Sequence, residues 1–266
     1  MTNSPPRNIE DGQSVSGSVN AVQRVGDTVI RPVGPWSKSV HQLLNHLESV
    51  DFLYLPRAIA LEQNKEFLAY IEGDVAMRPW PSCLLAESGI VAVAQMLLRY
   101  HQSVASYVPA PNSLWRMSGV QWKESMIVRH GDLGPWNMVW RSEQLVGLID
   151  WDFAEPGYPI EDLAQIDWDC VPLYPPQKSN QAGIAPSEQL PRLKLLCEAY
   201  GADIDRVIDK VVQMQTREFF RLKSIGTLGK EPWLSWVKSG GLQNIASASH
   251  WLYETYSPNV QQPDLC

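Results

Sequence analysis

The chain has 266 residues, which at about 150 residues per domain allows one large domain or two lobes. Hydrophobic residues make up 44% and charged residues 19%, a composition that supplies a buried core and argues against a disordered chain. The net charge of −7 argues against a broad nucleic-acid-binding surface, because such a surface needs clustered Lys and Arg to replace counterions. An acidic chain instead favours a cationic or neutral small partner.

The cysteines and the N-terminus exclude several further classes. Four cysteines lie far apart and form no Cys-x-x-Cys pair or Cys/His cluster, so neither a zinc site nor a disulfide framework is expected. The polar N-terminus lacks the apolar run of a signal peptide, and no apolar stretch reaches the ~20 residues of a membrane span. We therefore expect a cytoplasmic protein without a membrane or nucleic-acid partner.

The first part of the chain has the pattern of a small strand-rich lobe over residues 15–72, preceded by a flexible arm over residues 1–14. Extended runs at 21–25 and 28–31 flank the turn pair Gly26-Asp27, which predicts a β-hairpin. Ser37 is the expected N-cap of a helix whose apolar face begins at Val40. Apolar runs at 58–61 and 67–71 predict two more strands.

The remainder, residues 73–266, has the pattern of a larger helical lobe. Apolar residues recur at helical intervals in four segments: 86–104, 187–200, 203–223 and 241–256. Gly201 follows one of them, at the place of a helix C-terminal glycine. Residues 127–176 mix strands and loops. Together these patterns predict an α+β, bilobal protein with a small β-rich N-lobe and a larger helical C-lobe.

The sharpest motif begins at His130-Gly131-Asp132, with Asn137 five positions after the aspartate and Asp150 thirteen positions after the asparagine. Phosphoryl transfer needs a carboxylate that orients the attacking hydroxyl and accepts its proton. It also needs oxygen ligands that hold Mg²⁺ against the phosphates. The Asp-to-Asn spacing matches the protein-kinase catalytic loop, with Gly in place of Arg.

The same block, with the later Pro156-Gly157 and Glu161-Asp162-Leu163-Ala164, resembles the aminoglycoside phosphotransferase (phosphotransferase enzyme) family. The resemblance extends over residues 15–255. It implies a protein-kinase-like fold, ATP or GTP as phosphoryl donor, Mg²⁺, and a small hydroxylated acceptor. It also implies that Asp132 is the catalytic base and that His130 braces its loop. Asn137 and Asp150 would be the Mg²⁺ ligands, with Asp162 holding the loop from behind.

The resemblance places nucleotide-binding residues in the small lobe. Ser16 and Ser18 fall in the phosphate-covering loop, where small residues let backbone N–H groups approach anionic oxygens. Arg31 stands where the family has a strand lysine, and Arg can bind phosphate in a bidentate manner. Ala69 and Ile71 resemble the hinge that faces the base. The lysine's usual glutamate partner would fall near Val40 or His41, where no glutamate is present.

Several residues allow a purely structural interpretation as well as a functional one. We expect His41 at the surface, His101 packed in the core, and Asp152 as a loop brace. Asp167 and Asp169 could face a cationic substrate, but a solvated loop is preferred.

The 11 tryptophans also allow either a structural or a functional interpretation. Trp136, Trp140 and Trp151 lie in or beside the motif and are expected to wall the site. Trp233 and Trp236 could line an acceptor pocket, but a core position is preferred.

The sequence therefore predicts a nucleotide- and Mg²⁺-dependent phosphotransferase acting on an aminoglycoside-like or other antibiotic or metabolite. The alternative is a catalytically weak or inactive kinase-like binding protein, such as an immunity protein that sequesters a toxic peptide. Arg31 and the missing glutamate motivate that alternative.

Overall fold

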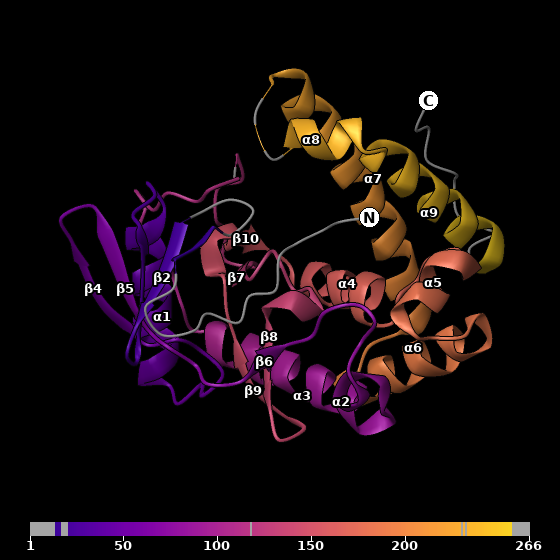
Figure 1. Ribbon diagram of the computed structural model, residues 1–266, viewed down its shortest axis with the longest axis horizontal. Coiled ribbons are helices and arrows are strands. Elements are labelled where there is room, and N and C mark those ends of the chain that lie inside the picture. Colours follow the sequence, from indigo (N-terminus) through magenta and orange to yellow (C-terminus); the bar gives the residue numbers. More distant parts are fainter. Residues whose placement is uncertain (1–13, 17–20, 118, 230, 232, 257–266) are drawn as a thin grey trace.

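The computed structural model describes residues 14–16, 21–117, 119–229, 231 and 233–256. Figure 1 shows a β-sheet region with one helix beside a larger, helical region, which confirms the predicted bilobal α+β architecture. The predicted arm, apart from Ser14, lies outside the described residues.

The small lobe is a five-stranded antiparallel sheet in the order β1-β2-β3-β5-β4. Its elements are β1 (Ser14–Ser16), β2 (Ala21–Val25), β3 (Thr28–Pro32), α1 (Ser37–Ser49), β4 (Ala58–Glu62) and β5 (Lys65–Ala69). The predicted hairpin is confirmed, since β2 and β3 pair around a turn in which Gly26 has a φ of 57°.

Helix α1 begins one residue earlier than predicted. Trp36 is the N-cap residue, and Ser37 is the first helical residue. The Ser37 hydroxyl accepts a hydrogen bond from the backbone N–H of Gly34 at 3.0 Å, outside the helix. The predicted capping role of Ser37 is therefore wrong, although the apolar face that begins at Val40 is buried as expected.

Two small sheets lie between the lobes and position the loops of the motif. The first joins β6 (Asp74–Val75), β8 (Met138–Arg141) and β9 (Gln144–Leu148), and the second pairs β7 (Ile127–Arg129) with β10 (Glu155–Gly157). The single-turn 3₁₀ segment η1 (Pro135–Asn137) directly precedes β8, and the similar segment η2 (Trp151–Phe153) lies between β9 and β10. Each segment of the motif therefore starts or ends at a paired strand.

The large lobe consists of helices that pack on one another. They are α2 (Ser82–Leu85), α3 (Glu87–Val104), α4 (Pro159–Cys170), α5 (Pro176–Ala182), α6 (Pro186–Tyr200), α7 (Ile204–Thr227), α8 (Trp233–Lys238) and α9 (Gly241–Tyr256). Helix α7 packs against α4 and α9, and Gly201 ends α6 with a left-handed backbone, as predicted. One apolar cluster runs from α1 through α3 to α4 and α7, so the two lobes share a core. Within the described ranges, the helices are too short or too polar to cross a membrane.

Candidate active site

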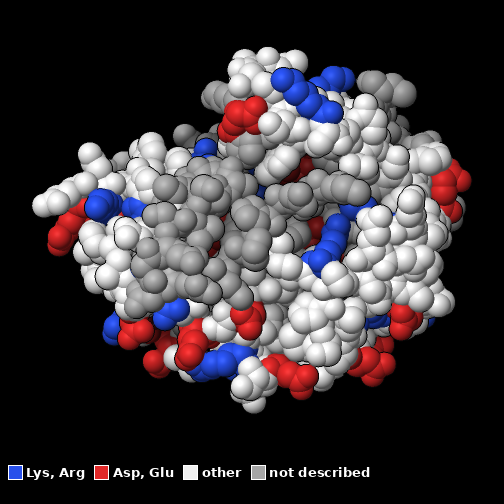
Figure 2. Space-filling view, viewed as in Figure 1, with Lys and Arg blue, Asp and Glu red and all other residues white. Residues whose placement is uncertain are grey.

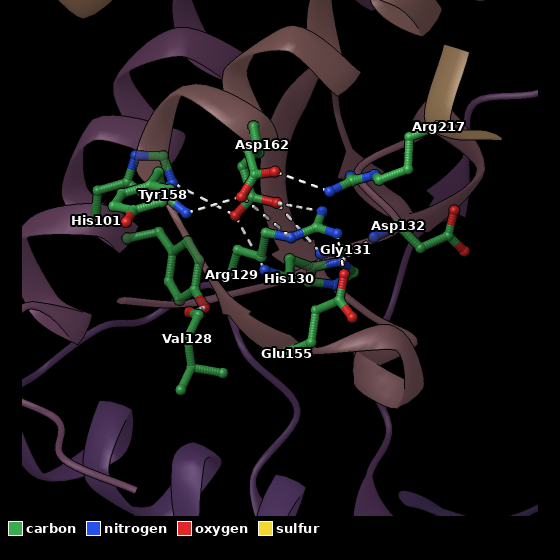
Figure 3. A network of polar contacts seen from close by, with 12 residues as sticks. His101, Val128, Arg129, His130, Gly131, Asp132, Glu155, Tyr158, Asp162 and Arg217 are labelled. Atoms are coloured by element: carbon green, nitrogen blue, oxygen red, sulfur yellow. Dashed lines mark hydrogen bonds and ion pairs between the residues drawn. The ribbon is translucent and has the colours of Figure 1, made fainter. Parts of the chain in front are cut away.

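A buried carboxylate holds the loop that carries the motif. Asp162, on the first turn of α4, accepts hydrogen bonds from the backbone N–H groups of His130 at 2.9 Å and Gly131 at 3.2 Å (Figure 3). The ring of His101 lies 3.4 Å from the same carboxylate and is buried, as predicted. Burial alone would raise the pKa of Asp162, but the bonds from His101 and His130 and the charge of Arg129 hold it below its usual range. The carboxylate is therefore ionised and fixes the backbone of the loop.

Gly131 is required by the conformation of the loop. Its φ is 79°, in the left-handed region that favours glycine. A Cβ atom at this position would overlap the carbonyl oxygen of Phe153. The loop therefore packs directly against the segment that follows Asp150.

His130 joins the two segments of the motif without carrying a charge. Its ring is fully buried and lies 4.5 Å from the ring of Trp151. Nδ1 accepts from the backbone N–H of Asp132 at 3.2 Å, so Nε2 carries the proton and donates to the carbonyl of Ile149 at 3.2 Å. Burial lowers the pKa of His130 to about 4, which keeps the ring neutral at pH 7. These contacts are those of a brace.

The structure brings Asp132 and Asn137 together. The Asn137 side-chain amide donates to the Asp132 carboxylate and to the Asp132 carbonyl, each at 2.8 Å. Asn137 is fully buried in η1, and its carbonyl accepts from the N–H of Ile149 at 2.9 Å. Asp132 is partly exposed and lines a cavity. The amide therefore fixes the orientation of a carboxylate that a ligand can reach.

Asp150 faces the same cavity from the other segment. Its backbone is left-handed, with φ 64° and ψ 60°, and its side chain is 22% exposed. An amide oxygen and a carboxylate, as offered by Asn137 and Asp150, are hard oxygen donors of the kind that Mg²⁺ takes. No group of three His, Cys, Asp or Glu side chains in the described part of the chain could hold a metal by itself. The donor chemistry thus fits Mg²⁺ when ligand or water oxygens complete its shell.

Arg31 lies at the centre of a buried cluster of carboxylates. Its Nε pairs with Glu66, while Nη2 lies 2.7 Å from Asp152 and Nη1 lies 3.4 Å from Asp150. The charges of these three carboxylates outweigh burial and raise its pKa above the ordinary arginine value. Arg31 therefore stays a cation that links β3 to the segment of Asp150.

Glu66 is the glutamate partner of Arg31 that the sequence pattern did not indicate. It lies on β5, directly opposite Arg31 in the strand register, rather than on α1. His41, on α1, lies with Nε2 2.9 Å from Glu66 Oε1 and is 8% exposed. The expectation of a surface histidine is therefore wrong, because the helix turns His41 toward the buried carboxylate. The signal that could have identified Glu66 is its place opposite Arg31.

A second arginine connects this cluster to the segment between α3 and β7. Arg116 lies 3.1 Å from Asp152, and its guanidinium stacks 4.6 Å from the ring of Trp36 and 4.8 Å from that of Phe153. Asp152 is 3% exposed and touches both arginines, contacts that agree with its predicted role as a brace.

One cavity of about 620 Å³ connects the two lobes. At one end it is lined by the sheet and the segment after β5, including Ala69 and Ile71. In the middle it is lined by Arg31, Asp132 and Asp150. Ser16, predicted in the phosphate-covering loop, is the last residue of strand β1, whereas Ser18 lies outside the described residues. Figure 2 shows acidic and basic side chains interspersed on this face, with no field of one sign.

The other end of the cavity lies among α4, α7, α8 and α9, where two expectations are wrong. Trp233 and Trp236 line the cavity and are not buried, because α8 packs at the edge of α7 and α9. Asp167 and Asp169 do not lie in a solvated loop but are buried on α4. Burial raises the pKa of both carboxyl groups. Trp136 lines the cavity as expected. The same expectation is wrong for Trp140 and Trp151, which are buried and do not line it.

Comparisons with known proteins agree with this geometry. A family model described as the phosphotransferase enzyme family matches residues 36–177. The trifolitoxin immunity protein of Rhizobium leguminosarum bv. trifolii is 36% identical over 192 residues, which cover 70% of this chain and 72% of that protein.

Solved structures share the fold. Amicoumacin kinase hAmiN, in complex with AMP-PNP and Ca²⁺, has a TM-score of 0.63 at 11% identity and covers 91% of this chain and 88% of that one. A choline/ethanolamine kinase family protein from Mesorhizobium loti has a TM-score of 0.58 at 12% identity, with 96% and 90% covered. The predicted kinase-like fold is confirmed.

Proposed function

The chain belongs to the phosphotransferase enzyme family, and from that premise we propose that it transfers the γ-phosphate of ATP or GTP to a hydroxyl group of a small molecule, with Mg²⁺. The observation that carries this proposal is the continuous cavity. It is lined by Ala69 and Ile71 at one end and by Asp132 at its middle, so a nucleotide at the hinge and an acceptor beside Asp132 can share it.

Asp132 is proposed as the catalytic base. The Asn137 amide donates to one of its carboxylate oxygens, and this fixed carboxylate would orient the acceptor hydroxyl and take its proton. Neutral His130 and ionised Asp162 are proposed to hold the loop in that geometry. Rigid placement of this kind supplies much of the acceleration in phosphoryl transfer.

Asn137 and Asp150 are proposed to hold Mg²⁺, which when bound offsets the negative charge of the phosphates. Arg31 would contribute in two ways. It pairs with Asp150 and so positions that carboxylate, and its buried positive charge lies in the wall of the cavity. A direct contact of Arg31 with the α- and β-phosphates stays a prediction, as do the roles of Ser16 and Ser18 in covering them.

The second candidate function is binding without phosphotransfer, as in an immunity protein that sequesters a toxic molecule. Two observations favour it. The relative at 36% identity is named for immunity to trifolitoxin. In addition, three carboxylates engage the guanidinium of Arg31, the group that the family resemblance assigns to phosphate.

Transfer assays on the full chain separate the two candidates. Phosphorylated product would be measured by mass spectrometry with ATP or GTP and Mg²⁺ across a panel of hydroxylated compounds. We expect Asp132→Asn to lower the rate by about 10²–10⁴-fold, the range for loss of a general base. The matched control is Asp205→Asn, at an exposed position on α7 outside the cavity.

Nucleotide binding gives the complementary measurement. A ligand that binds only the folded protein raises the midpoint of thermal unfolding. A rise with ATP or GTP and Mg²⁺, together with product that disappears in Asp132→Asn, supports the phosphotransferase. No rise at millimolar nucleotide and no product would favour the binding protein, and product formed at the wild-type rate by Asp132→Asn would remove Asp132 as base.

A further inference from the structure

The walls of the cavity beyond Asp132 are rich in apolar and aromatic side chains. They come from four helices: Trp168 on α4, Met214 and Leu222 on α7, Trp233 and Trp236 on α8, and Ile245 on α9. The rings of Trp233 and Trp236 meet edge to face, with centroids 6.4 Å apart and an interplanar angle of 76°. Figure 1 shows α8 beside α7 and α9 in the large lobe, apart from the sheet of the small lobe, so this wall lies at the large-lobe end of the cavity. Such walls bind the apolar body of a ligand.

The carboxylates at this end already have partners in the protein. Apart from Asp132 and Asp150, the acidic residues of the described chain that line the cavity are Glu155, Asp169 and Glu218. Glu155 pairs with Arg129, and Glu218 pairs with Arg221. Asp169 accepts a hydrogen bond from the hydroxyl of Tyr174 at 2.7 Å. A ligand cation would therefore have to compete with an existing partner at each of them.

The basic residues reinforce this point. Among the described residues, the cavity is lined by six Arg or Lys side chains: Arg31, Arg116, Arg129, Lys178, Arg217 and Arg221. Five acidic side chains oppose them, so the lining is not acidic although the whole chain has a net charge of −7. Charges of the two signs therefore pair with each other within the protein, and a polycation would lose hydration here while competing with the protein's own donors for the carboxylates.

Resting on the proposed phosphotransfer, we infer that the acceptor is an uncharged compound whose hydroxyl is carried by an aromatic or branched apolar body, and that polycations are poor ligands. The apolar body lies against Trp168, Trp233 and Trp236, which leaves the hydroxyl to point toward Asp132. On this inference aminoglycosides, which the net charge of the chain favours, are poor acceptors because the carboxylates at this end of the cavity already have partners.

Two matched tripeptides test this inference by isothermal titration calorimetry on the full chain without nucleotide. Acetyl-Leu-Ser-Trp-amide is neutral and apolar, and acetyl-Lys-Ser-Lys-amide carries two positive charges around the same serine hydroxyl. We expect the neutral peptide to bind at least about tenfold more tightly, which is about 1.4 kcal/mol. Its affinity should change little between about 50 and 300 mM salt, because screening acts on charges.

Three variants assign the preference to this end of the cavity. Trp236→Ser should weaken the neutral peptide about fivefold or more, since an apolar contact is lost. Phe220→Ser is the matched control, because Phe220 is an exposed aromatic residue on α7 that does not line the cavity. Arg221→Glu adds a carboxylate and frees Glu218, so it should raise the affinity for the dicationic peptide.

The inference is overturned if the dicationic peptide binds as tightly as the neutral one, or if the neutral peptide does not bind at millimolar concentration. Transfer is read separately, with ATP or GTP and Mg²⁺. A neutral peptide that binds preferentially but is never phosphorylated contradicts the proposed function and leaves the ligand preference standing.

Discussion

Two buried ionic clusters lie on either side of the segment that carries Asp132, and they are built in opposite ways. In the first, the single carboxylate of Asp162 receives two backbone N–H groups and the ring of His101. In the second, the guanidinium of Arg31 is surrounded by three carboxylates from β5 and from the segment at Asp150. The first cluster fixes the backbone of the loop that carries Asp132. The second fixes side chains, and its carboxylates outnumber the positive charge of Arg31. The first is suited to shaping a loop, and the second to receiving a cation.

The largest effect is expected when the first cluster is broken. Asp162→Ala leaves two backbone N–H groups and His101 buried without their acceptor, and we expect a loss of about 3–5 kcal/mol in the free energy of unfolding. Urea denaturation at pH 7 measures it. Asp205→Ala, at an exposed position on α7, is the control and should change stability little. A loss below about 1 kcal/mol for Asp162→Ala would mean that the loop is held by other contacts.

The neutral ring of His130, beside that cluster, predicts that the free energy of unfolding depends on pH. The pKa of His130 is about 4 in the folded protein against 6.5 for the free side chain. As the pH falls, the unfolded chain binds a proton at His130 before the folded protein does, and this favours unfolding. The contribution of His130 to the free energy of unfolding is therefore full above pH 6.5, and about 3 kcal/mol of it is lost as the pH falls toward 4.

Buried carboxyl groups with raised pKa values, such as that of Asp167, act in the opposite direction over the same range. The measurement is therefore the difference in free energy of unfolding between wild type and His130→Gln at several pH values. That difference should shrink as the pH falls from 6.5 to 4. A difference that stays constant would show that His130 titrates normally in the folded protein.

The second cluster should be less sensitive to the loss of one member, because Arg31 keeps two carboxylates when the third is removed. We expect Glu66→Gln to lower the free energy of unfolding by about 2 kcal/mol. Glu62→Gln, on the neighbouring strand and exposed, is the matched control. An effect as large as that of Asp162→Ala would remove the distinction between the clusters.

The same contrast explains which parts could be predicted from the sequence. Apart from His101 on α3, the Asp162 cluster is formed by residues within one block of the chain, and the spacing of Asp132, Asn137 and Asp150 indicated their proximity. The Arg31 cluster joins β3, β5 and the segment at Asp150, which are far apart in the chain. Sequence spacing does not encode such a juxtaposition, so Glu66 was missed and His41 was placed at the surface.

The end of the cavity among α4, α7, α8 and α9 could not be predicted for a related reason. Whether Trp233 and Trp236 are core or wall depends on how α8 packs at the edge of α7 and α9, not on their own periodicity. The net charge of the chain likewise could not reveal the charge that a ligand meets, because that charge is set by the cavity lining.

The substitution with the smallest expected effect, Arg31→Lys, tests whether the planar guanidinium of Arg31 matters beyond its positive charge. Arg31→Lys keeps a cation in the second cluster, but one ammonium group cannot reach three carboxylates in the planar arrangement of a guanidinium. We expect a loss of about 1–2 kcal/mol in the free energy of unfolding. Arg57→Lys, on an exposed residue of the small lobe, is the control.

The more informative readout of Arg31→Lys is the dependence of transfer on Mg²⁺. If Arg31 acts by positioning Asp150, the variant should need a higher Mg²⁺ concentration for half-maximal rate, while the KM for nucleotide changes less. If Arg31 instead contacts the phosphates directly, the KM for nucleotide should rise by the larger factor. If the Mg²⁺ dependence and the KM for nucleotide both stay at their wild-type values, only the positive charge at position 31 is required. The cluster would then act on the site through its net charge and not through the placement of Asp150.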